Sequence, residues 1–389
     1  MVKYNYKICG GVFIMRRYEL GMSLDYVSNW TVVDAVREIF QNSLDEEIQN
    51  PENKWYFNYD EESEVLKIGN KSSRLSTKSL LMGCSSKKND ENTIGQHGEG
   101  YKVATIVLLR NNCSVKIYNY NEREIWTAKV IKSRRYDANI GVYDIEKMGI
   151  LKSIPENNLI FEISGISSDM YKSIKEKNLW LQDDLGNVIE SEGYGRVLLE
   201  DRYAGKVFVK GLYVCDKEQL TYGYDLNPSL IKLDRDRGLI DSFDLQYSLG
   251  NLIIHTQNTD FIYKTKDLWD GYYIRSFTYY SGRGNMLEVY NRSLKKFRDK
   301  YGENAFPCTN QAEFNKLKRR GYNVAMVSEN EHYYISRASG YVNSNEPCIV
   351  DNRSIVDKFE DWFKKVKPFL SEELLNEGLD LLEDIKEEL

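Results

Sequence analysis

Three polar side chains near the start of the chain have the spacing of one helix face. Glu38, Asn42 and Asp45 occupy positions i, i+4 and i+7, so a period of 3.6 residues places them on one stripe. Carboxylate and amide oxygens gathered in this way can orient a water molecule and bind a hard cation such as Mg²⁺. The same spacing is also typical of a solvent-exposed helix face, so the stripe needs a second motif beside it.

The neighbouring residues predict the helix that carries this stripe. Thr31 followed by Asp34 has the form of a capping box, so the helix should begin there and run to about Ile48, ahead of Pro51. Apolar residues on its other side can pack on a core, and they are Val32, Val33, Val36, Ile39, Phe40 and Leu44.

A glycine-rich loop follows further along the chain. Gly95, Gly98 and Gly100 precede an apolar run from Tyr101 to Arg110, which predicts a buried helix or strand. Glycines let backbone N–H groups approach an anion, and a helix N-terminus adds a favourable dipole. Loops also collect glycine for turns, so the loop indicates an ATP site only in combination with the helix.

Together the two motifs resemble those of the GHKL ATPases, the superfamily of the gyrase B subunit, the large heat-shock chaperone, the histidine kinases and the MutL proteins. The helix motif matches at Glu38, Asn42 and Asp45. The chaperones' Ile-Gly-Gln-x-Gly-x-Gly loop matches Ile94 to Gly100, with His97 at the variable place. The resemblance implies a Bergerat-type ATP-binding fold, in which helices lie on a mixed, mainly antiparallel sheet and the nucleotide lies between them.

The resemblance also implies a role for each motif residue. Glu38 would be the catalytic base for the attacking water, Asn42 would bind Mg²⁺, and Asp45 would lie just behind them or on the ribose side. The family's kinases usually lack an acid at the position of Glu38, so its presence favours hydrolysis over phosphotransfer. The residues implied to contact the nucleotide in and after the loop are Gly95, Gln96, His97, Gly98, Glu99, Gly100 and Lys102.

The family's adenine-binding motif is altered in this chain. Val65 to Ser76 align with a strand followed by Asp-x-Gly-x-Gly, but Asn70 replaces the Asp, and Ser72 and Arg74 replace the glycines. An amide oxygen can still accept from the adenine amino group, although a neutral hydrogen bond contributes about 1 kcal/mol against about 1.5 to 3 for a charged one. Asn also carries two donors that could face the carbonyl of guanine, so ATP and GTP both stay open. The plainer alternative is a strand-to-helix turn.

The segment before the glycine loop corresponds to the family's ATP lid. Thr77 to Asn92 is rich in Ser and Lys, and Lys87, Lys88 and Lys102 are candidates to meet phosphate oxygens. For each lysine the alternative is a solvated surface charge. The Thr of the family's final sheet motif has no counterpart in Asn157 to Ile163.

Apolar runs divide the chain into four segments. We expect a GHKL-type ATP-binding domain at 1–165, a transducer-like α/β domain at 166–255, a small α/β module at 256–350, and an acidic tail of two amphipathic helices at 351–389, separated at Pro368. The fold class is therefore α+β. A basic helix is predicted at Gln311–Arg320, and strands are predicted at Ser114–Asn119, Ile125–Ile131, Ile140–Asp144, Leu159–Ser164, Lys206–Val214 and Tyr322–Val327.

In gyrase, MutL and the chaperones, the domain after the ATP fold sends a Lys or Arg to the γ-phosphate. By domain order Lys232, Arg235 and Arg237 are the candidates here. Asp234 and Asp236 form an Asp-x-Asp pair that could suggest a metal site, but alternating Asp and Arg is more simply a self-neutralised surface turn.

Composition limits the remaining possibilities. A chain of 389 residues with 41% hydrophobic content can bury a substantial core. A net charge of -6 gives no global basic field toward nucleic acid or an anionic membrane, although a local basic groove stays possible. Six scattered cysteines without a C-x-x-C pair, and the absence of a long apolar run, favour a reduced cytoplasmic protein without structural zinc or a membrane span.

We therefore expect a Mg-ATP-binding ATPase that acts as a conformational switch with slow hydrolysis, together with a protein partner or a nucleotide-dependent homodimer. The alternative is a non-hydrolysing nucleotide-binding or scaffold protein that binds a protein partner. A histidine kinase is disfavoured by Glu38 and by the lack of a phosphoacceptor helix pair ahead of the ATP motifs. A topoisomerase or nuclease is less favoured still.

Overall fold

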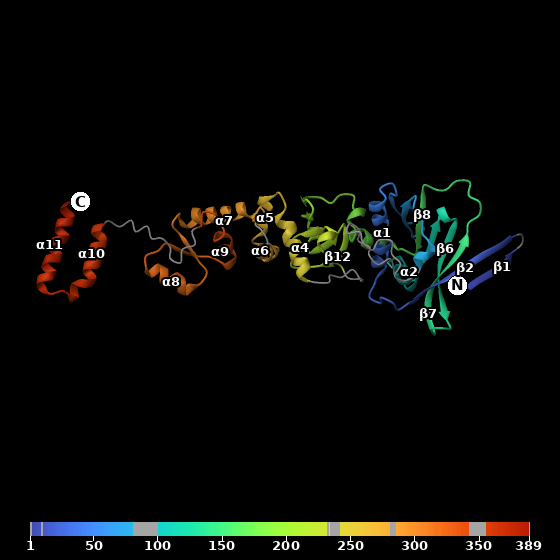
Figure 1. Ribbon diagram of the computed structural model, residues 1–389, viewed down its shortest axis with the longest axis horizontal. Helices are drawn as coiled ribbons and strands as arrows, with labels where there is room; N and C mark the ends of the chain where they lie inside the picture. The colour runs from blue at the N-terminus through green and yellow to red at the C-terminus, as the bar shows by residue number, and fades with distance from the viewer. Residues whose placement is uncertain are drawn as a thin grey trace. The chain divides into compact units, whose positions relative to one another are not determined.

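The chain forms an α+β structure, as the sequence predicts, and divides into two compact units, Met1–Asn285 and Met286–Leu389 (Figure 1). The computed structural model describes residues 2–8, 11–80, 100–231, 233, 242–280, 285–341 and 355–388. Within these ranges, no helix combines the length and apolar character needed to cross a membrane.

An eight-stranded sheet is the main element of the first unit. Its strand order is β1-β2-β7-β6-β5-β8-β4-β3, and every pair of neighbours is antiparallel. The four strands predicted between Ser114 and Ser164 are present as β5 to β8, although β8 pairs with β5 and β4 rather than with β7. The strands are β1 Val2–Ile8, β2 Gly11–Ser23, β3 Trp55–Asp60, β4 Val65–Lys71, β5 Ser114–Asn119, β6 Glu124–Ser133, β7 Ala138–Lys147 and β8 Asn157–Ser164.

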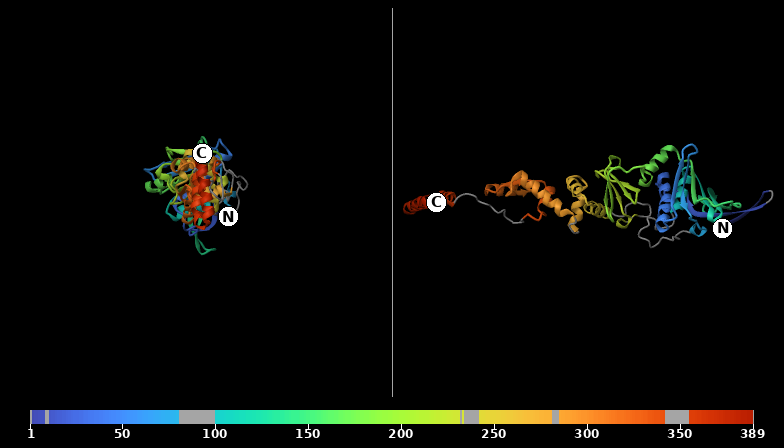
Figure 2. Two further views of the ribbon diagram at one scale, coloured as in Figure 1. Left: turned by 90° about the vertical axis from the view of Figure 1, so that its left-hand side faces the viewer. Right: turned by 90° about the horizontal axis from the view of Figure 1, so that it is seen from above.

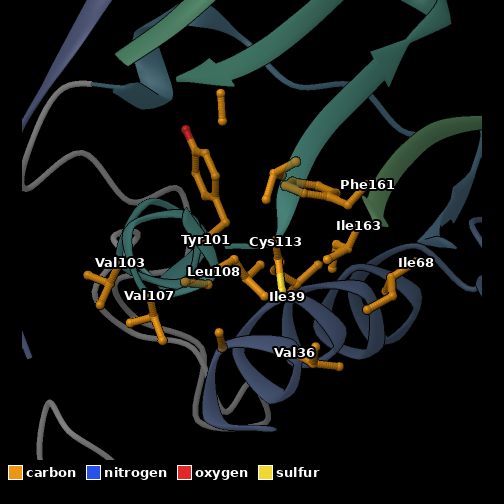
Figure 3. Close-up of a cluster of buried hydrophobic side chains, with 14 of the residues drawn as sticks. Val36, Ile39, Ile68, Tyr101, Val103, Val107, Leu108, Cys113, Phe161 and Ile163 are labelled. Atoms are coloured by element: carbon orange, nitrogen blue, oxygen red, sulfur yellow. The ribbon is translucent and has the colours of Figure 1, made fainter. Parts of the chain in front are cut away.

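Two helices pack together against this sheet. Helix α1 (Val32–Gln49) contacts β3 and β4, and helix α2 (Gly100–Arg110) contacts β2, β5, β6 and β7. The apolar run after the glycines is therefore a helix, the first of the two alternatives. Figure 3 shows Ile39 of α1 and Leu108 of α2 in one buried cluster with Ile163 of β8. The core thus holds α1 and α2 in fixed positions on the sheet.

Side chains fix the connection between β2 and α1 at both ends. Thr31 and Asp34 form the predicted capping box, in which each side chain accepts from the other's backbone N–H. At the end of α2, the guanidinium of Arg110 donates four hydrogen bonds of 2.9 to 3.1 Å to backbone carbonyls of this connection. The accepting residues are Leu24, Tyr26, Val27 and Trp30. This arrangement, here called the Arg110 clasp, ties the end of α2 to the start of α1.

Cross-strand ion pairs join β2, β6 and β7. The carboxylate of Asp144 accepts two hydrogen bonds from Arg17, at 2.6 and 2.8 Å, and lies 2.9 Å from the ammonium of Lys129. Burial acts to raise the pKa of Asp144, but the bonds and charges of Arg17 and Lys129 outweigh burial, so the pKa is lower than usual. Asp144 therefore stabilises the sheet as an ionised group.

A five-stranded sheet follows, in the order β12-β11-β13-β10-β9. The prediction of one strand at Lys206–Val214 is wrong, because β11 and β12 form a hairpin there. Lys210 and Gly211 reverse the chain with φ of 51° and 78°, in the left-handed region that glycine adopts readily. The strands are β9 Val188–Ser191, β10 Gly195–Leu198, β11 Lys206–Val209, β12 Leu212–Asp216 and β13 Gly223–Leu226.

Helices precede and follow the second sheet along the chain. They are α3 Ser168–Glu176 before the sheet, and α4 Ser242–Ile254, α5 Thr259–Thr265 and α6 Gly271–Tyr280 after it. Helix α4 packs on β10, β13 and α6. The buried carboxylate of Asp270 accepts a hydrogen bond from the hydroxyl of Tyr224 and one of 2.8 Å from the Thr221 N–H. These contacts attach the helices after residue 241 to the second sheet.

The second unit begins with a small α/β arrangement. Strands β14 (Phe306–Cys308) and β15 (Val324–Met326) are parallel and are connected through α8 (Gln311–Arg319), close to the predicted basic helix and strand. The remaining helices are α7 Met286–Tyr301, α9 Glu329–Ile335, α10 Ile355–Val366 and α11 Glu372–Glu388. Helices α10 and α11, red in the ribbon views, pack on each other with Pro368 in the turn between them, as predicted (Figure 1, Figure 2).

Candidate functional site

The polar stripe of α1 faces the interior of the first unit. Glu38 is 3% exposed and Asp45 is fully buried, while Asn42 is partly exposed. The alternative of a solvent-exposed face therefore does not hold for the two carboxylates. Carboxylates buried together on one helix face are often found at functional sites, so the stripe is a candidate site.

The first residue of α2 lies directly against this stripe. A Cβ atom placed on Gly100 would lie 2.6 Å from Oε2 of Glu38 and 3.7 Å from Nδ2 of Asn42. A Cβ atom at this position would push the carboxylate aside, so the first residue of α2 and the end of the Glu38 side chain lie close together. The N-terminus of α2, where backbone N–H groups and the helix dipole attract anions, is thereby next to Glu38 and Asn42.

The amide of Asn42 has a defined orientation. Its Nδ2 donates a hydrogen bond of 2.8 Å to the backbone carbonyl of Glu38. A carbonyl can only accept, so the nitrogen must face it and the oxygen Oδ1 must point the other way. Within the described residues no hydrogen bond reaches this oxygen, which leaves a hard ligand for a cation beside Glu38.

The amide of Asn70 is fixed in a similar way from β4. Its Nδ2 donates to the carbonyls of Ser43 and Asn53, each at 2.9 Å, and the residue is 3% exposed. These two bonds use both amide donors and join α1 and the following loop to the sheet. The oxygen of Asn70 accepts no hydrogen bond from the part of the chain that the structure describes, so it is available as an acceptor.

Lys102 lies on α2 with its ammonium group inside the protein. The side chain is fully buried, and Nζ donates a hydrogen bond of 3.0 Å to the carbonyl of Ser79. The hydroxyl groups of Tyr101 and Ser79 are 2.8 Å apart, and burial raises the pKa of Tyr101, although the bond to Ser79 opposes that shift. These contacts hold Ser79, near the start of the predicted lid, against the first turn of α2. Contact between Lys102 and phosphate stays a prediction.

The guanidinium of Arg37 also reaches the site. Its Nη2 lies 3.8 Å from Oε1 of Glu38, and its Nη1 lies 3.5 Å from Oδ1 of Asp34. Nη1 also donates to the backbone carbonyl of Tyr213, at 3.4 Å, on the second sheet. The sequence motif did not indicate Arg37, and its position next to Glu38 in the chain was the available signal.

Several predicted site residues lie outside the described residues, so their positions stay predictions. They are Lys88, Gly95, Gln96, His97, Gly98, Glu99, Lys232 and Arg235, together with Lys87, Asp234, Asp236 and Arg237. Among the residues that the structure does describe, no group of three or more His, Cys, Asp or Glu side chains could hold a metal ion.

Comparison with known proteins adds limited information. A family model described as the Mycoplasma pneumoniae MPN635 N-terminal domain matches residues 169–259. No curated protein matches the chain. The match to that family model covers the second sheet with α3 and α4, and leaves the stripe of α1, most of α5 and all of α6 outside it.

Among solved structures, the chain is similar to the ATPase region of Saccharomyces cerevisiae topoisomerase II, with a TM-score of 0.30 and 11% identity. The same ATPase region bound to ICRF-187 (dexrazoxane) gives a TM-score of 0.31 and 11% identity. In both comparisons the match covers 47% of this chain and 62% of the other. Similarity at this level assigns no activity, so the functional argument depends on the geometry of the site.

Proposed function

We propose that the chain binds Mg-ATP between α1 and the start of α2 and hydrolyses it slowly, as a nucleotide-driven conformational switch. The observation that carries this proposal is the close approach of Gly100 to Glu38 and Asn42. It combines an anion-binding helix N-terminus, a carboxylate and a free amide oxygen within one small region.

Each group has a distinct part in this proposal. The N-terminus of α2 attracts the phosphates, and the Oδ1 atom of Asn42 would hold Mg²⁺. When bound, Mg²⁺ neutralises phosphate charge and orients the phosphate oxygens. Glu38 accepts a proton from the attacking water, a contribution typical of about 10² to 10⁴ in rate. Asp45 supports these residues from within the core.

The orientation of Asn70 supports adenine rather than guanine as the base. Both amide donors are used on the carbonyls of Ser43 and Asn53, so only the oxygen can meet a base. An acceptor pairs with the amino group of adenine and repels the carbonyl of guanine. We therefore expect tighter binding of ATP than of GTP, which direct competition between the two nucleotides would measure.

The remaining parts of the switch are proposed from the family resemblance. Residues 1–165 would form the ATP-binding domain and 166–255 the transducer. The loop Gly95 to Gly100 with Lys88 would close over the phosphates, and Lys232 or Arg235 would sense the γ-phosphate. Nucleotide-dependent dimerisation or docking of a protein partner would follow closure.

Calorimetric titration with Mg²⁺ and a non-hydrolysable ATP analogue tests binding. We expect saturable binding to the wild type. Asn42→Ala should weaken the Mg-dependent binding. Gly100→Ala should also weaken binding, because its Cβ would collide with the carboxylate of Glu38. Gly149→Ala is a matched control, since no atom lies within 4 Å of its added Cβ. Absence of binding to the wild type would contradict the proposal.

Release of phosphate tests hydrolysis. Glu38→Ala should lose turnover by about 10² or more while it keeps its affinity for the analogue. Turnover that survives this substitution would remove Glu38 from the mechanism. The pair of measurements separates failure of binding from failure of chemistry.

The burial of Glu38 and Lys102 favours one second candidate. Glu38 is 3% exposed, and the ammonium of Lys102 is engaged by Ser79 inside the protein. Both are also expected of a non-hydrolysing nucleotide-binding or scaffold protein whose polar groups stabilise the core. Saturable ATP binding without phosphate release in the wild type would favour this candidate.

A further inference from the structure

Arg37 connects the polar stripe of α1 to the second sheet. One guanidinium contacts the carboxylate of Glu38 at 3.8 Å, that of Asp34 at 3.5 Å and the backbone carbonyl of Tyr213 at 3.4 Å. Only 13% of its side chain is exposed. Arg37 and Tyr213 are separated by 176 positions, so this contact exists only when the two sheets are packed together.

The surroundings of Arg37 make these contacts effective. Its Nε atom is buried without a hydrogen-bond partner among the described residues, so the guanidinium depends on its two terminal nitrogens. Val33, Ile174 and Asn178 line the same small cleft as Arg37, whose side chain has little contact with solvent. Electrostatic interactions are stronger where water is excluded.

The carbonyl of Tyr213 is a fixed anchor. The Tyr213 N–H donates to the carbonyl of Lys177 at 3.1 Å, and the Leu179 N–H donates to the carbonyl of Gly211 at 2.8 Å. The ammonium of Lys177 lies 4.7 Å from the centre of the Tyr213 ring. These contacts hold β12 against residues 177–179, so the carbonyl presents a rigid acceptor to α1.

We propose that Arg37 is a positioning residue that holds the carboxylate of Glu38 in its working orientation from an anchor on the second sheet. The inference rests on the proposed role of Glu38 as the base. The planar fork of arginine places one terminal nitrogen on the carbonyl of Tyr213 and the other beside the carboxylate of Glu38, whereas lysine has a single nitrogen on a flexible chain. Contact between the second sheet and α1 therefore sets the rate of hydrolysis, while nucleotide affinity is set elsewhere.

Steady-state kinetics of Arg37→Met and Arg37→Lys test this inference. A base displaced by about 1 Å can lose about a hundredfold in rate, so kcat should fall by about ten- to a hundredfold in Arg37→Met. The KM and the affinity for a non-hydrolysable analogue should stay close to wild type. Arg37→Lys should have a kcat as low as that of Arg37→Met, because lysine keeps the positive charge but lacks the two terminal nitrogens of the guanidinium. Arg135→Met, which replaces an exposed arginine between β6 and β7, is the control and should keep the wild-type rate.

The same substitution in a Glu38→Ala background shows whether Arg37 acts through Glu38. We expect the double variant to turn over no more slowly than Glu38→Ala alone. A wild-type kcat in Arg37→Met, full rescue by lysine, or a further loss in the double variant would each overturn the inference. Parallel losses of affinity and melting temperature would also overturn it, since they indicate a purely structural role. If the wild type shows no turnover, or Glu38→Ala keeps it, the proposed function itself fails and this inference falls with it.

Discussion

Helices α1 and α11 have nearly the same length and opposite surroundings. Helix α1 has 18 residues, ten of them buried, including Glu38 and Asp45. Helix α11 has 17 residues and eight carboxylates, and none of its residues between 372 and 384 is buried. A count of acidic residues would therefore favour α11, although only α1 of the two helices buries carboxylates within the described residues.

The difference between the two helices is the number of fixed contacts around each polar group. In α1, Gly100 of α2 lies beside the carboxylate of Glu38, and Asn70 of β4 donates a hydrogen bond of 2.9 Å to the backbone carbonyl of Ser43. In α11, water surrounds the exposed carboxylates, so nothing holds a carboxylate there in one fixed orientation. Substitutions at fixed contacts of the first unit, each compared with a substitution in α11, test this contrast.

The largest expected difference concerns the apolar face. Phe40 is fully buried beneath the stripe and packs edge-on against Trp55 and Phe57. Phe40→Ala should lower the free energy of unfolding of the first unit by about 3 to 5 kcal/mol, measured in urea. Leu381→Ala on α11, where the side chain is 50% exposed, should leave that value within about 0.5 kcal/mol. Equal effects would remove the contrast.

The second difference concerns Asn70, which stands where the resembled family has an Asp. Asn70→Asp restores the family residue, but it removes both donors from the carbonyls of Ser43 and Asn53 and buries a charge against them. We expect a loss of about 2 to 5 kcal/mol in unfolding free energy. Asn376→Asp on the exposed α11 is the control. A stable Asn70→Asp protein with tighter ATP binding would refute this account.

The third difference depends on pH. The ordinary pKa of Asp is about 3.9. The pKa of Asp144 lies below its usual value because Arg17 and Lys129 outweigh burial, so the group stabilises the fold at higher pH and loses that effect as pH falls through the folded-state pKa. Asp144→Asn should therefore cost about 1.5 to 3 kcal/mol above about pH 5, and the difference from wild type should shrink below about pH 4.

Urea unfolding of both proteins across this range measures the third effect. Glu383→Gln, which changes an exposed carboxylate of α11, should leave stability unchanged at every pH. A difference between Asp144→Asn and wild type that grows as pH falls would have the wrong sign for an ionised, paired carboxylate.

The smallest difference concerns the helix caps. Thr31→Ala removes the capping box of α1 and should lower the stability of the first unit by about 1 kcal/mol. Ser371 accepts from the Leu374 N–H at 3.4 Å at the start of α11, and Ser371→Ala should change only the helicity of the tail. Circular dichroism with urea unfolding separates the two results, and a loss of first-unit stability from the Ser371 change would contradict the contrast.

Local sequence signals were enough to predict the main elements. The capping box at Thr31 fixed the start of α1, and alternating apolar residues located β5 to β8. The hairpin β11–β12 was missed because the apolar residues run almost continuously across Lys210 and Gly211, and the turn depends on their left-handed backbone. Signals of period and capping are local, whereas this turn is stabilised by contacts with the rest of the second sheet.

The candidate site was predictable only in its residue types. The stripe followed from spacing and the pairing with the glycine loop from the family resemblance, but the orientation of Asn70 depends on carbonyls 17 and 27 positions away. The contact between Arg37 and Tyr213 joins positions 176 apart, and the burial of Lys102 depends on Ser79. Such groupings arise from tertiary packing, which no single motif contains.

The Arg110 clasp has a consequence for how this region opens. Four carbonyls from Leu24 to Trp30 are bonded to the two terminal nitrogens of one planar guanidinium. Movement of the guanidinium therefore breaks these bonds together. The segment that leads into α1 should consequently exchange its amide hydrogens as one cooperative block, together with the last turn of α2. Replacing Arg110 would remove all four bonds together, so this segment should then open independently of α2.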